Sequence, residues 1–569
     1  MIRHALAFAL LLLSPALAQA QFGETVEVRV TNVDAIVTDK NGNPVPGLTK
    51  DDFEVYEDGV RKDITHFTEI AHTRGADGVL AAALPAGSAA ASTQGELRRR
   101  LLTVLVDLGS LEPANRAAVL PRLQEFLTSN MRPGDAAAIY SWGDSLTVEL
   151  QPTSDRTAIK AAIDRIAAYP TERTTFWRQE LQFNLDRLLY VSQTHVERRP
   201  FLQEGIELTR RSAERGVAEM RSKTEAIKSI LAQMRGEDGQ KVLVLLTQSL
   251  GTNPAEEAFY YFSTLRTQFV DGQTIRPRAE AKRYDAEVNG LAADVAEAAN
   301  SAGVTLYPLH TAGKFSEVTD IESNKGGTMS ISARPPRLSR TTVSEGDPRL
   351  LSLSAASDET GGRAIAGTGN WDNAFKAVST ELNAYYSIGY SAGGERQDRI
   401  REIEVRPRNK SYRVRTRRTL VEQTAATAMK DLVAANLFQE GGTNDLAVKA
   451  DIGIAAPAGE NLVHPLTITI PTSTLTLTPD GTDLAGKLLV FAAFLRSDGA
   501  VSNVGPQVQQ FRFPAASLAR RKEVTVKLDV TADAKVGAIS LGVLDGASNA
   551  TGFALVKLSP TSVPAGSTE

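Results

Sequence analysis

The residues of this 569-residue chain best suited to chemistry form the tetrapeptide Gly-Asp-Ser-Leu at positions 143–146. In such a pattern the Ser145 hydroxyl would be the nucleophile of an ester hydrolase, activated by a His that a carboxylate orients. That chemistry requires an Asp three residues before a downstream His. The downstream histidines are His195, His310 and His464, and none has an Asp at that position. We therefore interpret the motif as a turn between two strands.

Other catalytic and cofactor motifs do not occur in the sequence. It contains no Gly-x-Ser-x-Gly nucleophile elbow, no phosphate-binding Gly-x-x-x-x-Gly-Lys loop and no His-Glu-x-x-His zinc pair. The chain has no Cys, which excludes disulfides, thiol nucleophiles and Cys-bound zinc. Its net charge of −4 provides no basic field for nucleic acid or anionic lipid. We therefore expect a protein that is not an enzyme and that has no cofactor.

The first 20 residues have the three parts of a secretory signal peptide. A basic start precedes the apolar residues 5–13, and the small-x-small sequence Ala-Gln-Ala ends at Ala20. The alternative is a membrane anchor, but the apolar run is shorter than the ~20 residues that cross a bilayer. No later stretch is long enough either. We expect cleavage near Ala20 and a periplasmic or secreted protein without a membrane span.

Apolar runs in the middle of the chain predict strands that are buried on both faces. Such strands are expected at 101–106, 242–246 and 304–309, and further strands at 136–141 and 146–150. The segments between them have helical patterns, with Thr-Ser-Asp at 153–155 as a cap before one helix and Gly303 as a stop after another. Strands that alternate with helices indicate an α/β fold, with a doubly wound, mostly parallel sheet.

Composition divides the first part of the chain into units. Residues 21–72 alternate apolar and polar side chains between turn signals, which predicts a small β domain that packs on its neighbour. Residues 73–98 are rich in Ala, Gly and Ser, as flexible linkers are. The α/β domain is expected to follow at 99–420.

Two segments interrupt the α/β pattern, and two more follow it. Residues 176–240 are charged and helical in period, which predicts an inserted helical hairpin. Its charges are either a solvated face or an interaction surface. A polar loop is expected at 313–348. A mainly helical connector at 421–444 then leads to an antiparallel β-sandwich at 445–569, where apolar residues alternate along the strands.

The order of these motifs resembles a von Willebrand factor A domain. Residues 102–107, followed by Leu-Gly-Ser, are similar to the first strand and ion-binding loop of that fold. Residues 134–141, 241–246 and 298–309 are similar to its later strands. The resemblance implies a von Willebrand A-like α/β domain with a helical insertion, flanked by a small N-terminal β domain and a C-terminal β-sandwich.

A narrower resemblance is to the von Willebrand A-related family found mainly in Acidobacteria. The leader Val-Pro-Gly-Leu-Thr-Lys-Asp-Asp-Phe at 45–53 is similar to that family's leader. So are Thr-Gly-Gly-Arg-Ala at 360–364 and the two strand-like segments 385–390 and 401–405. The likeness covers residues 25–420 well and the tail loosely.

The resemblance also implies a metal site. In the wider fold a strand ends in an Asp-x-Ser-x-Ser loop. A Thr and an Asp from two other loops complete an octahedral, oxygen-only site of the kind that Mg²⁺ prefers. Asp107 matches the first ligand, whereas Gly109 and Leu111 stand at the two Ser positions.

The other ligand positions are also altered. Thr174 or Thr175 is the candidate Thr, and Gln248 stands where the second Asp is expected. Ser110 would point elsewhere if the loop geometry is retained. We therefore expect no intact magnesium site, and we expect Asp107 to cap its loop by accepting backbone N–H bonds.

The resemblance implies a binding or adhesion-type role with a protein partner. The ligand-binding face would lie at the strand carboxyl ends, near Asp107, Ser110, Thr174 and Gln248. The alternative is a structural subunit of a cell-envelope assembly that uses the helical insertion and the β domains. A hydrolase is the third class, and it would have to lose ester hydrolysis in Ser145→Ala.

Overall fold

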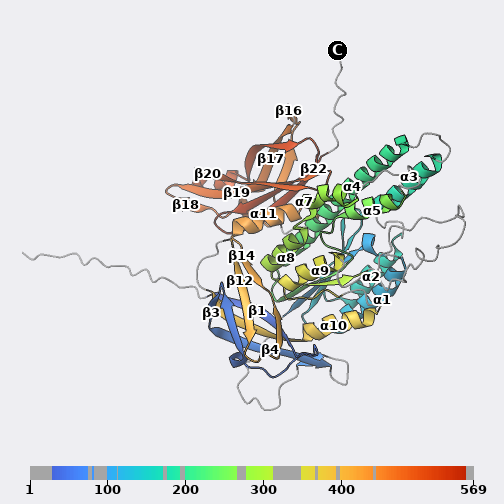
Figure 1. The fold of residues 1–569 in the computed structure, drawn as a ribbon. Helices are drawn as coiled ribbons and strands as arrows, with labels where there is room; N and C mark the ends of the chain where they lie inside the picture. Colours follow the sequence, from blue (N-terminus) through green and yellow to red (C-terminus); the bar gives the residue numbers. More distant parts are fainter. Residues whose placement is uncertain are drawn as a thin grey trace, which may run out of the picture.

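The computed structural model shows three packed units (Figure 1). It describes residues 29–74, 80–82, 99–111, 113–170, 176–192, 199–265, 277–311, 348–365, 370–392, 398–439, 444–459 and 461–558. The expected signal peptide, most of the expected linker and nearly all of the loop expected at 313–348 lie outside these residues.

The central unit is built on a mixed five-stranded sheet with the order β10-β9-β6-β7-β8. Its strands are β6 (Arg100–Asp107), β7 (Ala136–Trp142), β8 (Leu146–Thr153), β9 (Gln240–Thr247) and β10 (Val304–His310). Only β7 and β8 pair antiparallel, and every other pair is parallel. The expected mostly parallel α/β sheet is therefore present, with one antiparallel edge strand. Ser145 lies in the tight β7–β8 turn, as the sequence predicted.

Helices cover both faces of this sheet, which explains its long apolar strands. Alternate residues of β6 enter different cores, because successive side chains of a strand point to opposite faces. One core includes α1 (Pro113–Asn130), α2 (Arg156–Ala168) and α10 (Trp371–Asn383). The other includes α8 (Leu291–Ala302), α9 (Pro348–Glu359) and the end of α4 (Arg199–Met234).

Two of the predicted helix boundaries are confirmed. The Asp155 side chain accepts the backbone N–H of Thr157 and caps α2. Gly303 ends α8 with φ 71°, in the left-handed region that suits glycine. The helix expected before Gly303 is broken into α6 (Pro277–Ala281), α7 (Asp285–Val288) and α8, because Gly290 also has a positive φ of 97°.

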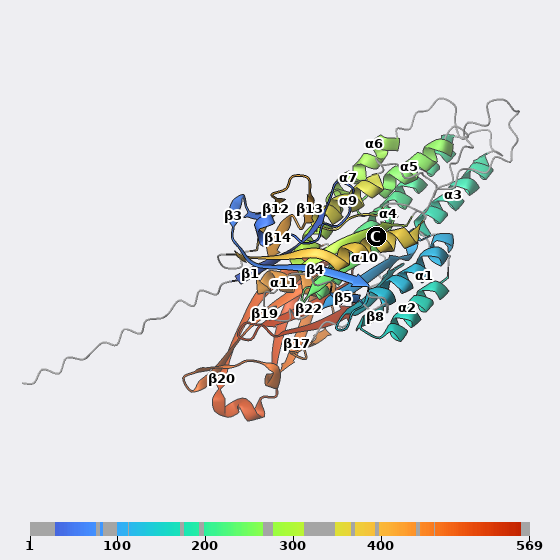
Figure 2. The same cartoon turned by 90° about the horizontal axis from the view of Figure 1, so that it is seen from below.

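The expected helical hairpin consists of α3 (Phe176–Ser192) and α4, and α5 (Pro254–Leu265) packs beside it. Figure 2 shows α3, α5 and α6 extending away from the rest of the molecule on one side. α4 is not only an insertion, however. It is 36 residues long, and its last turns bury Ile227 and Ile230 in the sheet's second core.

The N-terminal strands do not form a domain of their own. β1 (Arg29–Thr38) and β4 (Ile64–Arg74) pair on either side of β11 (Ala384–Ala392), which belongs to the region 99–420 expected to form the α/β domain. β2 (Phe53–Glu57) likewise pairs with β12 (Arg399–Pro407). The structure therefore corrects the expected boundaries, since strands from both ends of the 29–422 region fold into one β unit.

This β unit has two sheets around one core. The sheet orders are β13-β1-β11-β4-β5 and β14-β12-β2-β3. The remaining strands are β3 (Val60–Lys62), β5 (Leu80–Ala82), β13 (Arg413–Thr416) and β14 (Thr419–Glu422). Val33, Val55 and Ile388 are among the residues buried between the sheets.

The C-terminal unit is a sandwich of two antiparallel sheets that share one apolar core. One sheet contains β15 (Lys449–Ile452), β16 (Ala456–Ala458), β17 (Asn461–Pro471) and β21 (Glu523–Asp533). The other contains β18 (Thr478–Asp480), β19 (Asp483–Arg496), β20 (Val501–Pro514), β22 (Val536–Asp545) and β23 (Thr551–Lys557).

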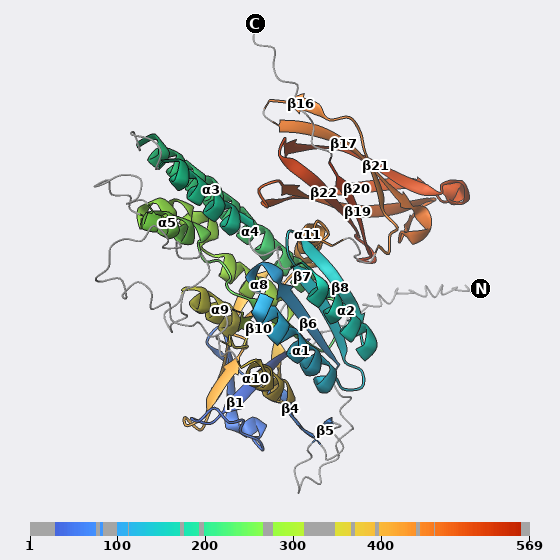
Figure 3. The same ribbon diagram turned by 90° about the vertical axis from the view of Figure 1, so that its right-hand side faces the viewer.

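The helix α11 (Ala425–Ala435) lies between the sandwich and the central unit (Figure 3). Met429 and Val433 of α11 are buried against the β19–β22 sheet. On the other side of α11, Asp431 pairs at 3.0 Å with Arg235, just after α4. Gln439, four residues after the end of α11, donates to Ser229 of α4 at 3.0 Å. Among the described helices, none combines the length and apolarity that a membrane crossing requires.

Candidate functional site

The polar residues that end β6 and β9 lie together in the middle of the central sheet. Asp107 is the last residue of β6, and Thr247 is the last residue of the neighbouring parallel strand β9. From β6 the chain continues to β7 on one side, whereas β9 and β10 lie on the other. Such a switch point is where α/β sheets form their binding sites.

Asp107 is almost fully buried, with 2 % of its surface exposed, and both of its oxygens are hydrogen-bonded. Oδ2 accepts the Ser110 hydroxyl at 2.6 Å and the Thr247 hydroxyl at 2.7 Å. Oδ1 accepts the Ser110 backbone N–H at 3.2 Å. Asp107 thus caps the turn Leu108–Ser110, as expected, and it also links β6 to β9 through its hydrogen bond with Thr247.

The positive charge beside Asp107 comes from Lys223 of α4. Its Nζ lies 3.0 Å from Asp107 Oδ2, 3.4 Å from Thr247 Oγ1 and 3.3 Å from the Ser249 carbonyl oxygen. An ammonium group has three donors, and these three oxygens can accept all of them. Lys223 is 7 % exposed, so the ion pair is shielded from water.

The electrostatics of Asp107 follow from these contacts. Burial by itself would raise the pKa of Asp107. The charge of Lys223 and the hydrogen bonds from Ser110 and Thr247 outweigh burial, so the pKa lies below its usual value. Asp107 is therefore a carboxylate at neutral pH, and its charge is balanced inside the protein.

A second group of charges surrounds this ion pair. Glu219 lies one helical turn before Lys223, and burial raises its pKa although the charge of Lys223 opposes the rise. On α3, Arg178 forms two 2.7 Å contacts with the Glu257 carboxylate of α5. Such forked pairs are geometrically specific, and this one ties α3 to α5 beside the site.

The structure places two of the other predicted site residues, Ser110 and Gln248, at the Asp107 turn. Ser110 does not point elsewhere, which corrects the expectation: the tight turn directs its hydroxyl to Asp107. Gln248 Nε2 donates to the Ser110 carbonyl oxygen at 2.9 Å, and Thr311 Oγ1 donates to the same oxygen at 3.2 Å. Gln248 therefore supports the turn. Thr174 and the alternative Thr175 lie outside the described residues.

Sequence reasoning missed Lys223 and Thr247. The signal for Lys223 was its place on α4, where it lies four residues before Ile227 and seven before Ile230 on the buried face. A lysine on an apolar helix stripe has to find a buried carboxylate, because an isolated charge is too costly to bury. The sequence contained this indication, but it did not identify the partner.

The residues present do not fit a magnesium ion. The oxygens of Asp107, Ser110 and Thr247 are the right chemical type for a hard cation. However, the Lys223 ammonium already contacts Asp107 and Thr247, so an ion between them would meet a positive charge. Among the residues that the structure describes, no three His, Cys, Asp or Glu side chains converge as metal ligands.

Comparisons with known proteins add little to this geometry. The sequence matches no protein-family profile and no curated protein. Among solved structures, an aerotolerance-related membrane protein from Bacteroides fragilis is similar over 50 % of this chain and 98 % of its own, at 12 % identity and a TM-score of 0.23. The conserved hypothetical protein BatB from Bacteroides thetaiotaomicron is similar over 50 % of this chain and 97 % of its own, at 10 % identity and a TM-score of 0.22.

Proposed function

We propose that this chain is an exported, non-enzymatic binding protein whose von Willebrand A-like domain engages a protein partner without a metal ion. The observation that carries the proposal is the 3.0 Å pair between Lys223 and Asp107. In a metal-dependent site, the ion offers a positive charge to an incoming carboxylate. Here that charge belongs to the protein and is already neutralised.

The likeness to a von Willebrand A domain is part of this proposal. Its support is the sequence motifs together with a sheet that has an Asp at the end of the central strand β6 and one antiparallel edge strand. The narrower likeness to the family found mainly in Acidobacteria rests on the sequence motifs alone. Export rests on the N-terminal sequence pattern.

The contact surface that we favour is the outer face of α3 and α5. Phe183 and Tyr190 lie seven residues apart on α3 and are 66 % and 73 % exposed, and Tyr260 on α5 is 64 % exposed. Arg187 is exposed between the two α3 aromatics. Large aromatic and Arg side chains dominate the binding energy of protein interfaces. The ligand-binding face expected at the strand ends is less suitable, because Asp107 and Ser110 are buried.

The alternative, a structural subunit of an envelope assembly, has one observation in its favour. α4 packs in the core of the sheet and in the core of the α3–α5 helices, and its Ser229 accepts a buried hydrogen bond from Gln439, just after α11. It therefore connects the helices that carry the exposed aromatics to the segment that leads into the C-terminal sandwich. A stiff connection of this kind suits a component that holds neighbours at a fixed spacing.

Site-specific photo-crosslinking tests the proposal. A photo-crosslinking amino acid at Tyr190 is expected to capture one defined protein in producing cells, equally with and without EDTA. The same residue at Ile454, which is 95 % exposed on the sandwich, is the control and should not capture it. The captured protein, once purified, should bind the wild type in EDTA and bind a Phe183→Ala, Tyr190→Ala variant at least about tenfold more weakly. Capture or binding that needs a divalent ion would refute the proposal.

A further inference from the structure

The strand β20 forms one edge of the C-terminal sandwich. It is 14 residues long, and in the described part of the chain it pairs with β19 and with no other strand. Its second edge therefore directs every second backbone N–H and C=O group away from the sheet. Such an edge is a template for another strand, and proteins usually protect it with charged side chains, prolines or a covering segment.

The second half of β20 lacks these protective features. Pro506 and Pro514 bound the segment 507–513, Gln-Val-Gln-Gln-Phe-Arg-Phe, which contains no proline. Its one charged side chain is Arg512, and this residue pairs with Asp480 of β18. The segment therefore presents no net charge that would repel a second strand.

An edge of the other sheet in the sandwich is built differently. Among the described strands, β21 pairs only with β17, so it also has an open edge. Its exposed side chains include Glu523, Lys527 and Asp529. Charges at alternating positions of this kind oppose the addition of a strand. The sandwich thus protects the edge of β21 and leaves that of β20 open, which indicates that the β20 edge has a partner.

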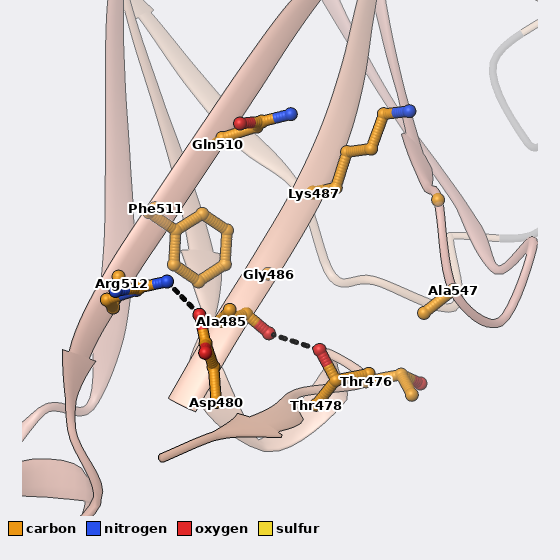
Figure 4. A pocket seen from close by; sticks show the side chains of 11 residues that line it. Thr476, Thr478, Asp480, Ala485, Gly486, Lys487, Gln510, Phe511, Arg512 and Ala547 are labelled. Atoms are coloured by element: carbon orange, nitrogen blue, oxygen red, sulfur yellow. Dashed lines mark hydrogen bonds and ion pairs between the residues drawn. The ribbon is translucent and has the colours of Figure 1, made fainter. Parts of the chain in front are cut away.

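The outer face of β20 has an apolar side chain that a neighbouring strand would cover. Because side chains alternate along a strand, Val508, Gln510 and Arg512 lie on the same face of the sheet as Lys487 of β19. Figure 4 shows Gln510 beside Lys487, and Arg512 in its ion pair. Val508 is 51 % exposed. Side chains that face each other across two strands are in contact, so an added strand would shield Val508 from water.

The open segment lies at the end of the sandwich that is remote from the central unit. At the other end, the β19–β20 turn packs on α4, where a Cβ atom at Gly499 would lie 2.0 Å from the Ser222 Oγ. β20 begins just after this turn and runs away from α4 to residues 507–513. In Figure 2 this end of the sandwich projects away from α3 and α5. A second molecule can therefore approach β20 without meeting the helices.

We propose that β20 pairs with β20 of a second copy of this chain, antiparallel and about a two-fold axis at Gln510, so that two sandwiches share one continuous sheet. Gln510 is the middle residue of 507–513, so this register pairs the whole proline-free segment with itself. Val508 then lies opposite Arg512 of the partner subunit, and the two Gln510 amides can hydrogen-bond to each other. No like charges face each other in this register.

The same features favour a second copy over a charged peptide. Arg512 is already balanced by Asp480, so the edge offers a charged peptide no counter-charge. A second copy presents the same neutral edge, and antiparallel pairing about a two-fold axis makes two identical edges complementary.

Introduced cysteines test the pairing directly, because the chain has no Cys. In Gln510→Cys the two thiols of a dimer would face each other across the axis. Facing residues of antiparallel strands have Cα atoms about 4.5–5.5 Å apart, within the roughly 4.4–6.8 Å that disulfides span. We expect mild oxidation to convert most of the purified variant into a disulfide-linked dimer. Ser502→Cys, at an exposed position of β20 outside the pairing segment, is the matched control and should stay largely uncrosslinked.

Light scattering after size-exclusion chromatography measures association without a crosslink. We expect the wild-type protein to have twice the mass of one chain. Val508→Lys should raise the dimer Kd about tenfold or more, because the new ammonium group would lie opposite Arg512 of the partner subunit. Val508 is exposed, so this variant is expected to fold normally. Thr525→Lys places the same charge at an exposed position of β21 and should leave the Kd unchanged.

Several results would overturn the proposal. One is a wild-type protein that is monomeric at the highest concentration that chromatography allows. Another is equal crosslinking of Gln510→Cys and Ser502→Cys. A dimer that Val508→Lys leaves intact would have its interface elsewhere. A monomeric wild type whose Gln510→Cys variant instead crosslinks to a different protein in producing cells would assign the edge to that protein and refute pairing between copies.

Discussion

At the scale of single residues, the Asp107–Lys223 pair predicts a large and specific stability effect. Removing one partner of a buried ion pair typically costs about 3–5 kcal/mol, because the other charge stays buried without compensation. We therefore expect Lys223→Met to lower the free energy of unfolding by about that amount, measured in urea. The double variant Asp107→Asn, Lys223→Met should recover most of the loss, because no buried charge remains.

Lys228→Met is the matched control for Lys223→Met. Lys228 lies on the same helix, and its ion pair with Glu225 is partly exposed, so its loss should cost less than about 1 kcal/mol. If the Lys223 and Lys228 variants lose the same stability, the buried pair has no special role. A double variant less stable than Lys223→Met would likewise contradict the electrostatic explanation.

The same pair predicts a pH dependence. The folded-state pKa of Asp107 is lowered, so the stability that it contributes is present above its unfolded pKa of about 3.9 and is lost as the pH falls through the folded value. In Lys223→Met the buried Asp107 gains protons at a higher pH. The stability difference between wild type and variant should therefore shrink steadily as the pH falls from about 7 to about 4.

In the wild type, Glu219 changes the stability with pH in the opposite direction to Asp107. Its pKa is raised, so its contribution is present at low pH and is lost as the pH rises above its unfolded pKa. Unfolding curves of Glu219→Gln, collected over the same pH range, separate the contribution of Glu219 to the pH dependence of stability from that of Asp107. The free energies of unfolding of the wild type and Lys223→Met should therefore differ by an amount that changes with pH. A difference that stays constant with pH would show that Lys223 is not what lowers the pKa of Asp107.

At the scale of elements, the close packing of α4 on α5 predicts which glycine matters. A Cβ atom at Gly205 would lie 2.6 Å from the Phe262 ring, which is fully buried and cannot move aside. Gly205→Ala should therefore destabilise the protein by about 1–3 kcal/mol in urea unfolding. Gly236→Ala, where a Cβ atom meets nothing within 4 Å, is the control and should be neutral. Equal effects of the two changes would show that α4 and α5 are less tightly packed than described.

Sequence patterns predicted the elements better than their partners. The apolar runs of β6 and β9 and the helix end at Gly303 depend on neighbouring residues in the sequence, and the structure has these elements where the sequence predicted them. Asp107 could be recognised because it ends an apolar run. Lys223 could not be assigned to it, because the two residues are 116 positions apart and only the course of α4 brings them together.

At the scale of the whole molecule, the pairing of strands from distant segments of the chain determines which fragments can fold on their own. β1 and β4 hydrogen-bond to β11 along most of their length, so a fragment of residues 99–420 would leave β11 and β12 without their partners. We expect that fragment to aggregate or to be digested rapidly in limited proteolysis, because it exposes unpaired strand edges. A fragment of residues 29–422 should resist digestion. Comparable resistance of both fragments would contradict the shared β unit.

The expected boundaries failed at this point for a physical reason. Period-two patterns identify a strand and its buried face, but they contain no information about which strand lies beside it. The segment 29–74 and its partners at 384–422 are separated by the whole α/β unit. Since that pairing depends on tertiary packing, it could be seen only in the structure.

The central claim, that Lys223 and not a metal ion neutralises Asp107, is tested most directly by calorimetry. The purified protein would be titrated with Mg²⁺, Mn²⁺ and Ca²⁺, and the titrations repeated on Asp107→Ala. Our account predicts no saturable heat for any ion in the wild-type protein, because Lys223 already neutralises Asp107. Saturable binding by the wild type that disappears in Asp107→Ala would contradict it, since the ion would then have displaced Lys223.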